Sequence, residues 1–133
     1  MVAKPAVKIS KPIARKLDVL DMLAMHRLVE SKCDVRALVE GKRDLESMRA
    51  LGFTRVEELD GALYEVVERY EKGETVQLLM DLDSEGVKLY KRLRADFTQR
   101  GVRIDDDIRS ALFATPVRHI EGLSGWIARR DSK

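Results

Sequence analysis

The chain has 133 residues, a length that suits one domain with a single sizeable core. Its 25 basic and 23 acidic residues give a net charge of +2, which excludes an argument for nucleic-acid binding from the total charge alone. The single cysteine, Cys33, excludes an internal disulfide, and no apolar run resembles a signal peptide or a membrane span, so the composition predicts a cytoplasmic protein without a membrane segment.

The first 32 residues are expected to form a basic arm and an amphipathic helix. Residues 1–16 contain five basic side chains, two prolines and no acid. Such an arm would either neutralise nucleic-acid phosphates or remain a solvated tail. Apolar residues then recur at helical spacing, which predicts a helix over residues 13–30 that packs on the rest of the domain or mediates pairing of two chains.

From residue 33 onward, short apolar runs alternate with helical patterns. Strands are predicted at five places: up to residue 39, and over 53–59, 76–80, 102–104 and 117–120. Helical patterns occupy the intervals between them, over residues 42–51, 63–70, 84–100 and from 107 on. The alternation predicts an α/β fold with a mainly parallel sheet of four or five strands flanked by helices.

Acidic residues follow two of the predicted strands. The stretch Val76–Gly86 changes from an apolar run to alternating acids, Asp81 and Asp83, and then to a glycine that is expected to allow a tight turn into the next helix. Glu40 follows the first strand in the same way. Since ligands of open parallel sheets bind outside the carboxyl ends of the strands, the three carboxylates are expected to converge and to bind Mg²⁺ or Mn²⁺.

Two motifs carry a family resemblance: V-E-G-K-R-D over residues 39–44, and D-L-D-S-E-G over residues 81–86. In this order they resemble the two motifs of the Toprim domain, which topoisomerases, bacterial-type primases, nucleases of the overcoming-lysogenization-defect type, recombination mediators and the ribonuclease that matures 5S ribosomal RNA share. The resemblance covers about residues 33–123 and is greatest to small stand-alone archaeal-type Toprim proteins. It implies a Rossmann-like sheet over this range, with residues 124–133 as a C-terminal tail.

The resemblance also implies roles for individual residues. Glu40 would be a metal ligand or a general acid/base, and Asp81 and Asp83 would be Mg²⁺ ligands. Glu85 matches the third acid of the Asp-x-Asp-x-Glu form found in type IA topoisomerases, which implies a second metal ion or a position just outside the first set of ligands.

Each candidate also has a structural interpretation. Acids at strand ends often form caps or turns, and Lys42 and Arg43 would either hold a nucleic-acid backbone at a helix start or be solvated. The acidic run Asp105–Asp107 is expected to cap a helix rather than to bind a metal. His26 and His119 have no cysteine or histidine partner at ligand spacing and are interpreted as structural, with contact to substrate as the alternative for His119.

The leading functional hypothesis is Mg²⁺-dependent phosphodiester chemistry on RNA or DNA, most similar to that of a nuclease. Two alternatives stay open: a non-catalytic nucleic-acid-binding or assembly module, and the Toprim subunit of a complex that resembles a primase or a topoisomerase. Those larger activities need regions for which one domain has no room, so they imply a protein partner; a homo-oligomer is also compatible with the sequence. Trp126 would stack on a base or, in the structural interpretation, pack on the core.

Overall fold

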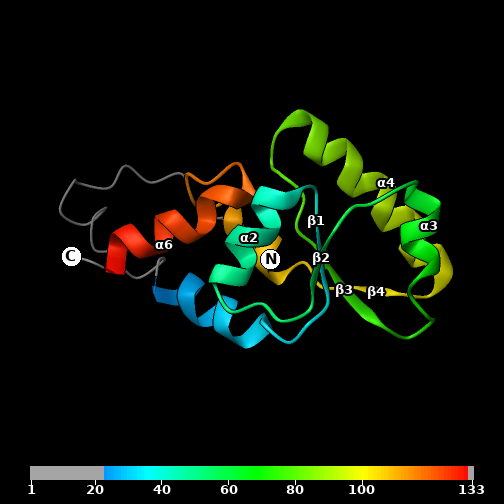
Figure 1. Cartoon of the computed structure of the whole chain (residues 1–133), viewed down its shortest axis with the longest axis horizontal. Coiled ribbons are helices and arrows are strands. Elements are labelled where there is room, and N and C mark those ends of the chain that lie inside the picture. Colours follow the sequence, from blue (N-terminus) through cyan, green and yellow to red (C-terminus); the bar gives the residue numbers. More distant parts are fainter. Residues whose placement is uncertain (1–22, 132–133) are drawn as a thin grey trace, which may run out of the picture.

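The computed structural model describes residues 23–131, and a four-stranded parallel sheet lies at their centre (Figure 1). Its strands are β1 (Ala37–Val39), β2 (Val56–Glu58), β3 (Thr75–Leu78) and β4 (Arg103–Ile104). The spatial order is β2-β1-β3-β4, and every neighbouring pair is parallel. The predicted α/β class and the mainly parallel sheet are confirmed.

Helices cover both faces of the sheet (Figure 1). The described chain begins with a helix over residues 23–32, followed by α2 (Lys42–Ala50), α3 (Leu63–Glu68), α4 (Ser84–Arg100), α5 (Asp107–Leu112), the 3₁₀ turn η1 (Ile120–Gly122) and α6 (Leu123–Asp131). The first helix, α2 and α6 lie on one face, whereas α3 and α4 lie on the other. No helix among the described residues is long and apolar enough to cross a membrane.

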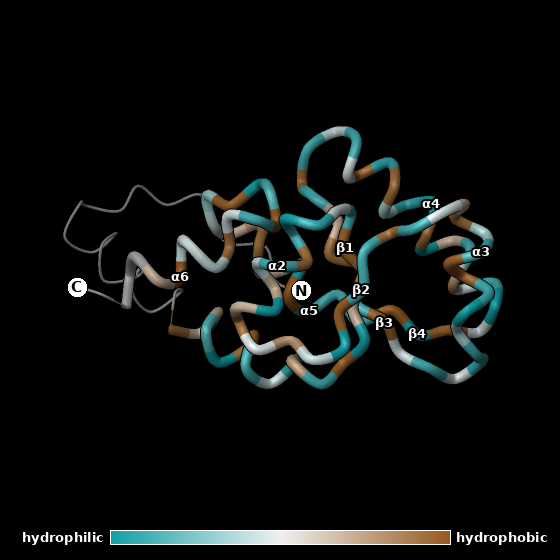
Figure 2. The backbone as a smooth tube through the Cα atoms, in the orientation of Figure 1, coloured by the Kyte–Doolittle hydropathy of each residue, from teal (hydrophilic) through white to brown (hydrophobic). Residues whose placement is uncertain are grey.

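The two faces of the sheet bury two separate hydrophobic clusters. Successive residues of β1 point to opposite faces, so Ala37 and Val39 enter one cluster and Leu38 enters the other. Because both faces are covered, all three residues of β1 are apolar and buried, and the last three residues of β3 are buried on both faces, including the polar Gln77 (Figure 2). This double burial explains why the sequence shows apolar runs rather than a polar and apolar alternation.

Both ends of the described chain join the first of these clusters. Met25 and Val29 of the first helix and Trp126 and Ile127 of α6 are buried there. The part of the predicted amphipathic helix before residue 23, and the basic arm, lie outside the described residues. Trp126 packs on the core, as its structural interpretation proposed.

The predicted fifth strand over residues 117–120 is wrong. This segment forms no ladder: Arg118 accepts one backbone hydrogen bond, from the Leu82 N–H at 2.7 Å, and a 3₁₀ turn starts at Ile120. Val117 and Ile120 are buried while Arg118 and His119 between them are exposed, a spacing that differs from the period of two expected of a strand.

Candidate metal centre

The candidate site lies where the strand order of the sheet reverses. β1 and β3 are neighbours; the chain continues from β1 to β2 on one side and from β3 to β4 on the other. In parallel sheets with this order, ligands bind in the crevice outside the carboxyl ends of the two strands at the reversal. Glu40 follows β1, and Asp81 and Asp83 follow β3, so all three predicted carboxylates lie at this crevice.

Each carboxylate is held in place by a backbone N–H group. Glu40 Oε2 accepts a hydrogen bond from the Asp81 N–H at 2.7 Å, so residues 41 positions apart are in direct contact. Asp81 Oδ1 accepts from the Ile120 N–H at 2.8 Å, and Asp83 Oδ1 accepts from the Gly86 N–H at 2.8 Å. Each acid therefore uses one oxygen for anchoring and keeps the other for a ligand.

Asp83 is the N-cap of α4, so the predicted structural role of an acid at a strand end is seen here. The cap uses Oδ1 alone, and a carboxylate has a second oxygen that can serve a ligand.

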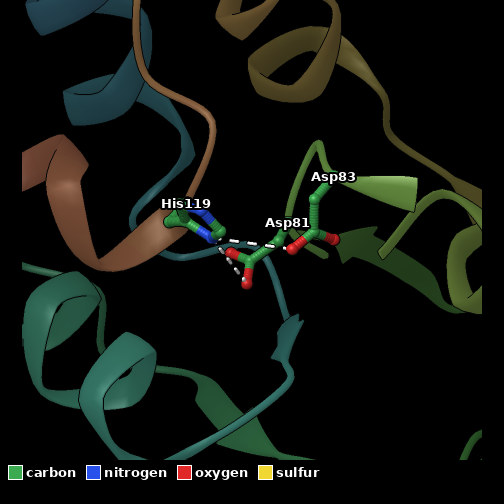
Figure 3. A group of neighbouring side chains, drawn as sticks. All are labelled: Asp81, Asp83 and His119. Carbon is green, nitrogen blue, oxygen red and sulfur yellow. Dashed lines mark ion pairs between the residues drawn. The ribbon is translucent and has the colours of Figure 1, made fainter. Parts of the chain in front are cut away.

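Among the described residues, the side chains close enough together to share one metal ion are Asp81, Asp83 and His119 (Figure 3). His119 therefore takes the place in the ligand set that sequence reasoning predicted for Glu40. Its Nδ1 lies 3.4 Å from Asp81 Oδ2 and 3.8 Å from Asp83 Oδ2. The hydrogen bond to Asp81 and the charge of the same carboxylate raise the pKa of His119. Sequence reasoning assigned this histidine a structural role, because its partners lie 36 and 38 residues away and no local spacing connects them.

The cluster has suitable dimensions for a single divalent ion. One ligand atom from each of Asp81, Asp83 and His119 can be chosen so that all lie within 4.8 Å of one another. Two ligands of an octahedral ion at about 2.1 Å lie about 3.0 Å apart when adjacent and about 4.2 Å apart when opposite. The two measured separations of the imidazole nitrogen, 3.4 and 3.8 Å, fall within this interval. The residues present therefore fit a metal ion.

Partial burial gives the acids next to the cluster an unusual electrostatic environment. Burial is the largest cause of a raised pKa for Glu40, and the charges of Asp81, Asp83 and Asp44 raise it further. Asp44, which accepts a hydrogen bond from the Gly41 N–H at 3.1 Å, is itself buried and also has a raised pKa. Its position three residues after Gly41 is the spacing of a capping box, a signal visible in the sequence.

Arg109 of α5 contacts the chain directly after β3. Its guanidinium is buried, donates from Nη1 to the Met80 carbonyl at 2.8 Å and lies 4.0 Å from the centroid of the Tyr90 ring. Burial lowers the pKa of Arg109. Met80 directly precedes Asp81, so this contact fixes the backbone from which the aspartate projects. Sequence reasoning did not single out Arg109, because nothing in the local pattern separates it from a solvated arginine.

Gly86 is required by a close approach and not by its backbone angles. Its φ is not positive, and it lies inside the first turn of α4. A Cβ at this position would lie 2.0 Å from the carbonyl oxygen of Asp81. The sequence was right that glycine is needed here, but the expected reason, a tight turn, was wrong.

Comparisons with known proteins place the chain in a family. Over 100 residues it is 31% identical to the UPF0292 protein MJ1624 of Methanocaldococcus jannaschii, a match that covers 70% of this chain and 78% of that protein. The chain belongs to the UPF0292 family. A solved structure, described as a putative protein from Aquifex aeolicus, matches 74% of this chain and 94% of its own with a TM-score of 0.67 and 26% identity. A comparison with models of known protein families gives no match.

The other predicted site residues of this UPF0292 protein lie around the cluster. Glu85 is on the first turn of α4 with 82% of its side chain exposed, and it is 3.9 Å from Lys88, outside the three-residue cluster. Lys42 and Arg43 are exposed on the first turn of α2, directly after Glu40-Gly41. The Toprim assignment of these positions remains a hypothesis from the sequence motifs.

Proposed function

We propose that this protein binds Mg²⁺ or Mn²⁺ through Asp81, Asp83 and His119, with Glu40 beside them as a general acid/base, and acts on phosphodiester bonds of nucleic acid, as a nuclease of the Toprim type. The observation that carries the proposal is the convergence of three anchored carboxylates from the ends of β1 and β3. Acids that repel one another are typical of a place where a cation is bound.

The protein groups around the cluster have separate tasks in this proposal. When bound, the metal ion would supply Lewis-acid polarisation of a phosphoryl oxygen and lower the pKa of a coordinated water. Asp81 and Asp83 would hold the ion through the carboxylate oxygens that do not accept a backbone hydrogen bond. Glu40, whose pKa is raised by burial and by neighbouring acids, is suited to accept a proton from an attacking water and to release it afterwards.

Lys42 and Arg43 would contact the backbone of the nucleic acid. Both are exposed at the start of α2, next to the acid cluster, and neither forms an ion pair with another described residue. Phosphate contacts of this kind carry no sequence information, but they make affinity fall as salt rises. Replacing both residues should therefore weaken substrate binding and reduce the slope of affinity against salt, without a change in metal affinity.

The decisive experiment combines metal binding with cleavage. The full chain is incubated with structured RNAs and with single- and double-stranded DNAs, in Mn²⁺, in Mg²⁺ or in EDTA, and Mn²⁺ affinity is measured by calorimetry. The proposal predicts cleavage of at least one substrate in metal and none in EDTA, and loss of both cleavage and Mn²⁺ binding in Asp81→Asn.

Glu40→Gln separates chemistry from folding, since glutamine can still accept the hydrogen bond from the Asp81 N–H. This variant should keep the fold and lose cleavage. Metal-independent nucleic-acid binding with no products under any condition would instead support the binding module, and no binding of either kind would reject both functions.

A further inference from the structure

The helix that starts at the metal cluster, α4, has basic residues on its outer side. Residues 86–95 contain four basic side chains and no acid: Lys88, Lys91, Arg92 and Arg94. Arg94 forms an ion pair with Asp106, whereas the other three are exposed. Two of them follow Lys88 by three and four positions, so all three project from the same side of the helix. Lys88, Lys91 and Arg92 form the basic face of α4.

The stability of the helix does not account for this arrangement. Like charges three or four positions apart on a helix repel each other, so Lys88 destabilises α4 together with Lys91 and Arg92. Among residues 23–131, these three form one ion pair, between Lys88 and Glu85 at 3.9 Å, with side chains that are 77% and 82% exposed. Such an exposed pair contributes little. A bound anion would remove the repulsion, so the basic face is complementary to a polyanion.

The position of the basic face relates it to the metal cluster. Asp83 is the N-cap of α4, and at about 1.5 Å per residue Lys88 and Arg92 lie about 7.5 and about 13.5 Å farther along the helix axis. Along one strand of a duplex, phosphates follow one another every ~3.4 Å. A strand with one phosphate at the metal cluster would therefore reach both residues within about four nucleotides.

Basic residues also lie beside the acids on the opposite face of the sheet. Lys42 and Arg43 are exposed on the first turn of α2, which follows Glu40. Glu40 in turn accepts the hydrogen bond from the Asp81 N–H. Since α2 and α4 cover opposite faces of the sheet (Figure 1), an anionic chain that crosses the carboxyl ends of β1 and β3 would have cations on both sides of the acids.

We propose that the basic face of α4 binds the phosphodiester backbone of nucleic acid on one side of the scissile phosphate, while Lys42 and Arg43 bind it on the other. The position of the scissile phosphate rests on the proposed function. The inference adds that the substrate extends over several nucleotides along α4, so the protein binds a polymer and not an isolated nucleotide. This surface reads no sequence, because lysine and arginine contact phosphates in the same way beside every base.

The test measures binding in EDTA, where no metal-dependent cleavage takes place. Labelled single-stranded RNA, single-stranded DNA and duplex DNA are titrated with the full chain at several salt concentrations, and binding is followed by fluorescence anisotropy. The form that binds most tightly identifies the source of the backbone. For this form, Lys88→Gln/Lys91→Gln/Arg92→Gln should lower affinity about tenfold or more, and should reduce the slope of log affinity against log salt by about two to three.

The matched control is Arg27→Gln/Arg49→Gln/Arg69→Gln, which removes three exposed basic residues from the first helix, from α2 and from the end of α3. It changes the net charge by the same amount and should leave affinity and slope nearly unchanged. The Tm of the basic-face variant should equal or exceed that of the wild type, because the variant loses like-charge repulsion. Equal losses of affinity in the two triple variants, or no salt-dependent binding of any of the three nucleic acids, would overturn the proposal.

Cleavage assays in Mn²⁺ separate this inference from the proposed function. Salt-dependent binding that the basic-face variant weakens, without metal-dependent cleavage by the wild type, would support the basic face and reject the nuclease. Metal-dependent cleavage by the wild type, with unaltered binding in the basic-face variant, would reject the basic face alone.

Discussion

Two Asp-x-Asp sequences follow strands of the same sheet, and the fold treats them differently. Asp105 and Asp107, after β4, lie 2.7 and 2.8 Å from the Lys32 ammonium, which occupies the space between them. Among residues 23–131, Asp81 and Asp83 have His119 as their one basic neighbour, with its Nδ1 at 3.4 and 3.8 Å from their carboxylates. The acids after β4 therefore have a lysine fixed between them, whereas the described residues place no lysine or arginine beside the acids after β3.

The residue between the paired acids shows the same difference. Asp106 accepts hydrogen bonds from the Tyr90 hydroxyl at 2.8 Å and from Arg94 at 2.7 Å, whereas the corresponding Leu82 is buried in the core. Asp105 Oδ1 accepts from the Asp107 N–H at the start of α5, whereas Asp106, the N-cap residue, makes no side-chain capping bond. The Asp-x-Asp spacing alone therefore does not distinguish a candidate metal site from a salt bridge. The two pairs differ in whether a lysine already neutralises the carboxylates.

The largest expected effect is on metal affinity. Asp81→Asn should lower Mn²⁺ affinity by on the order of 100-fold, because it removes a charged ligand from the cluster that has no lysine. Asp105→Asn is the matched control and should leave Mn²⁺ affinity unchanged. Calorimetric titration of both variants measures the difference, and equal losses in the two would contradict the distinction drawn between the clusters.

Gly86→Ala tests the close packing of α4 against the backbone of Asp81. The added methyl group would meet the Asp81 carbonyl, so the backbone that carries the ligand has to move, at a cost of about 3 kcal/mol in the free energy of unfolding. Gly125→Ala in α6 meets no atom within 4 Å and should be neutral or stabilise by up to about 1 kcal/mol. Urea denaturation of both variants would measure this contrast, and a Gly86→Ala protein as stable as the wild type would show that the close approach is not rigid.

Lys32→Gln should leave Asp105 and Asp107 without their lysine, as Asp81 and Asp83 are. Loss of this partly buried ion pair should reduce the free energy of unfolding by about 1 kcal/mol. Asp105 and Asp107 would then lack a cation and should gain weak Mn²⁺ binding, seen as a second site in calorimetry that Lys32→Gln/Asp105→Asn lacks. A protein with one Mn²⁺ site before and after the change would show that geometry, and not the lysine, prevents binding.

The smallest effect is a difference in pH dependence between the two cations. The pKa of His119 is raised by Asp81, so its stabilising contribution is complete below about pH 6.5 and is lost as the pH rises through the higher folded-state pKa. The pKa of Lys32 is raised above 10.5, mainly by its hydrogen bond to Asp105, so its contribution persists until the solution is strongly alkaline.

Thermal unfolding in metal-free buffer from about pH 6 to about pH 9 distinguishes the two cations. The difference in Tm between the wild type and His119→Gln should shrink across this range, whereas the difference for Lys32→Gln should stay constant. A constant difference for both variants would mean that His119 does not interact with Asp81 in solution.

Local patterns predicted the elements that position the site. The apolar run before Asp81, the acid after Val39 and the helical spacing after Ser84 each depend on burial periodicity within one element, and β1, β3 and α4 confirm them. The contact of Glu40 with Asp81 was predictable despite 41 intervening positions, because parallel strands bring their carboxyl ends to one edge.

Contacts from segments without a regular pattern were not predictable. The chain from Val117 to Ile120 was interpreted as a strand, yet it provides His119 and the N–H group that anchors Asp81. Lys32 reaches Asp105 over 73 positions from the end of a helix. Nothing local in the sequence distinguishes these side chains from solvated ones.

The sequence by itself determined which residues are acidic, which runs are buried and in what order strands and helices alternate, because those depend on composition and period over a few residues. Only the tertiary structure decided which acids have a cation beside them. That depends on where loops and helix ends distant in the chain pack against the sheet, and packing of this kind leaves no periodic trace in the residues involved.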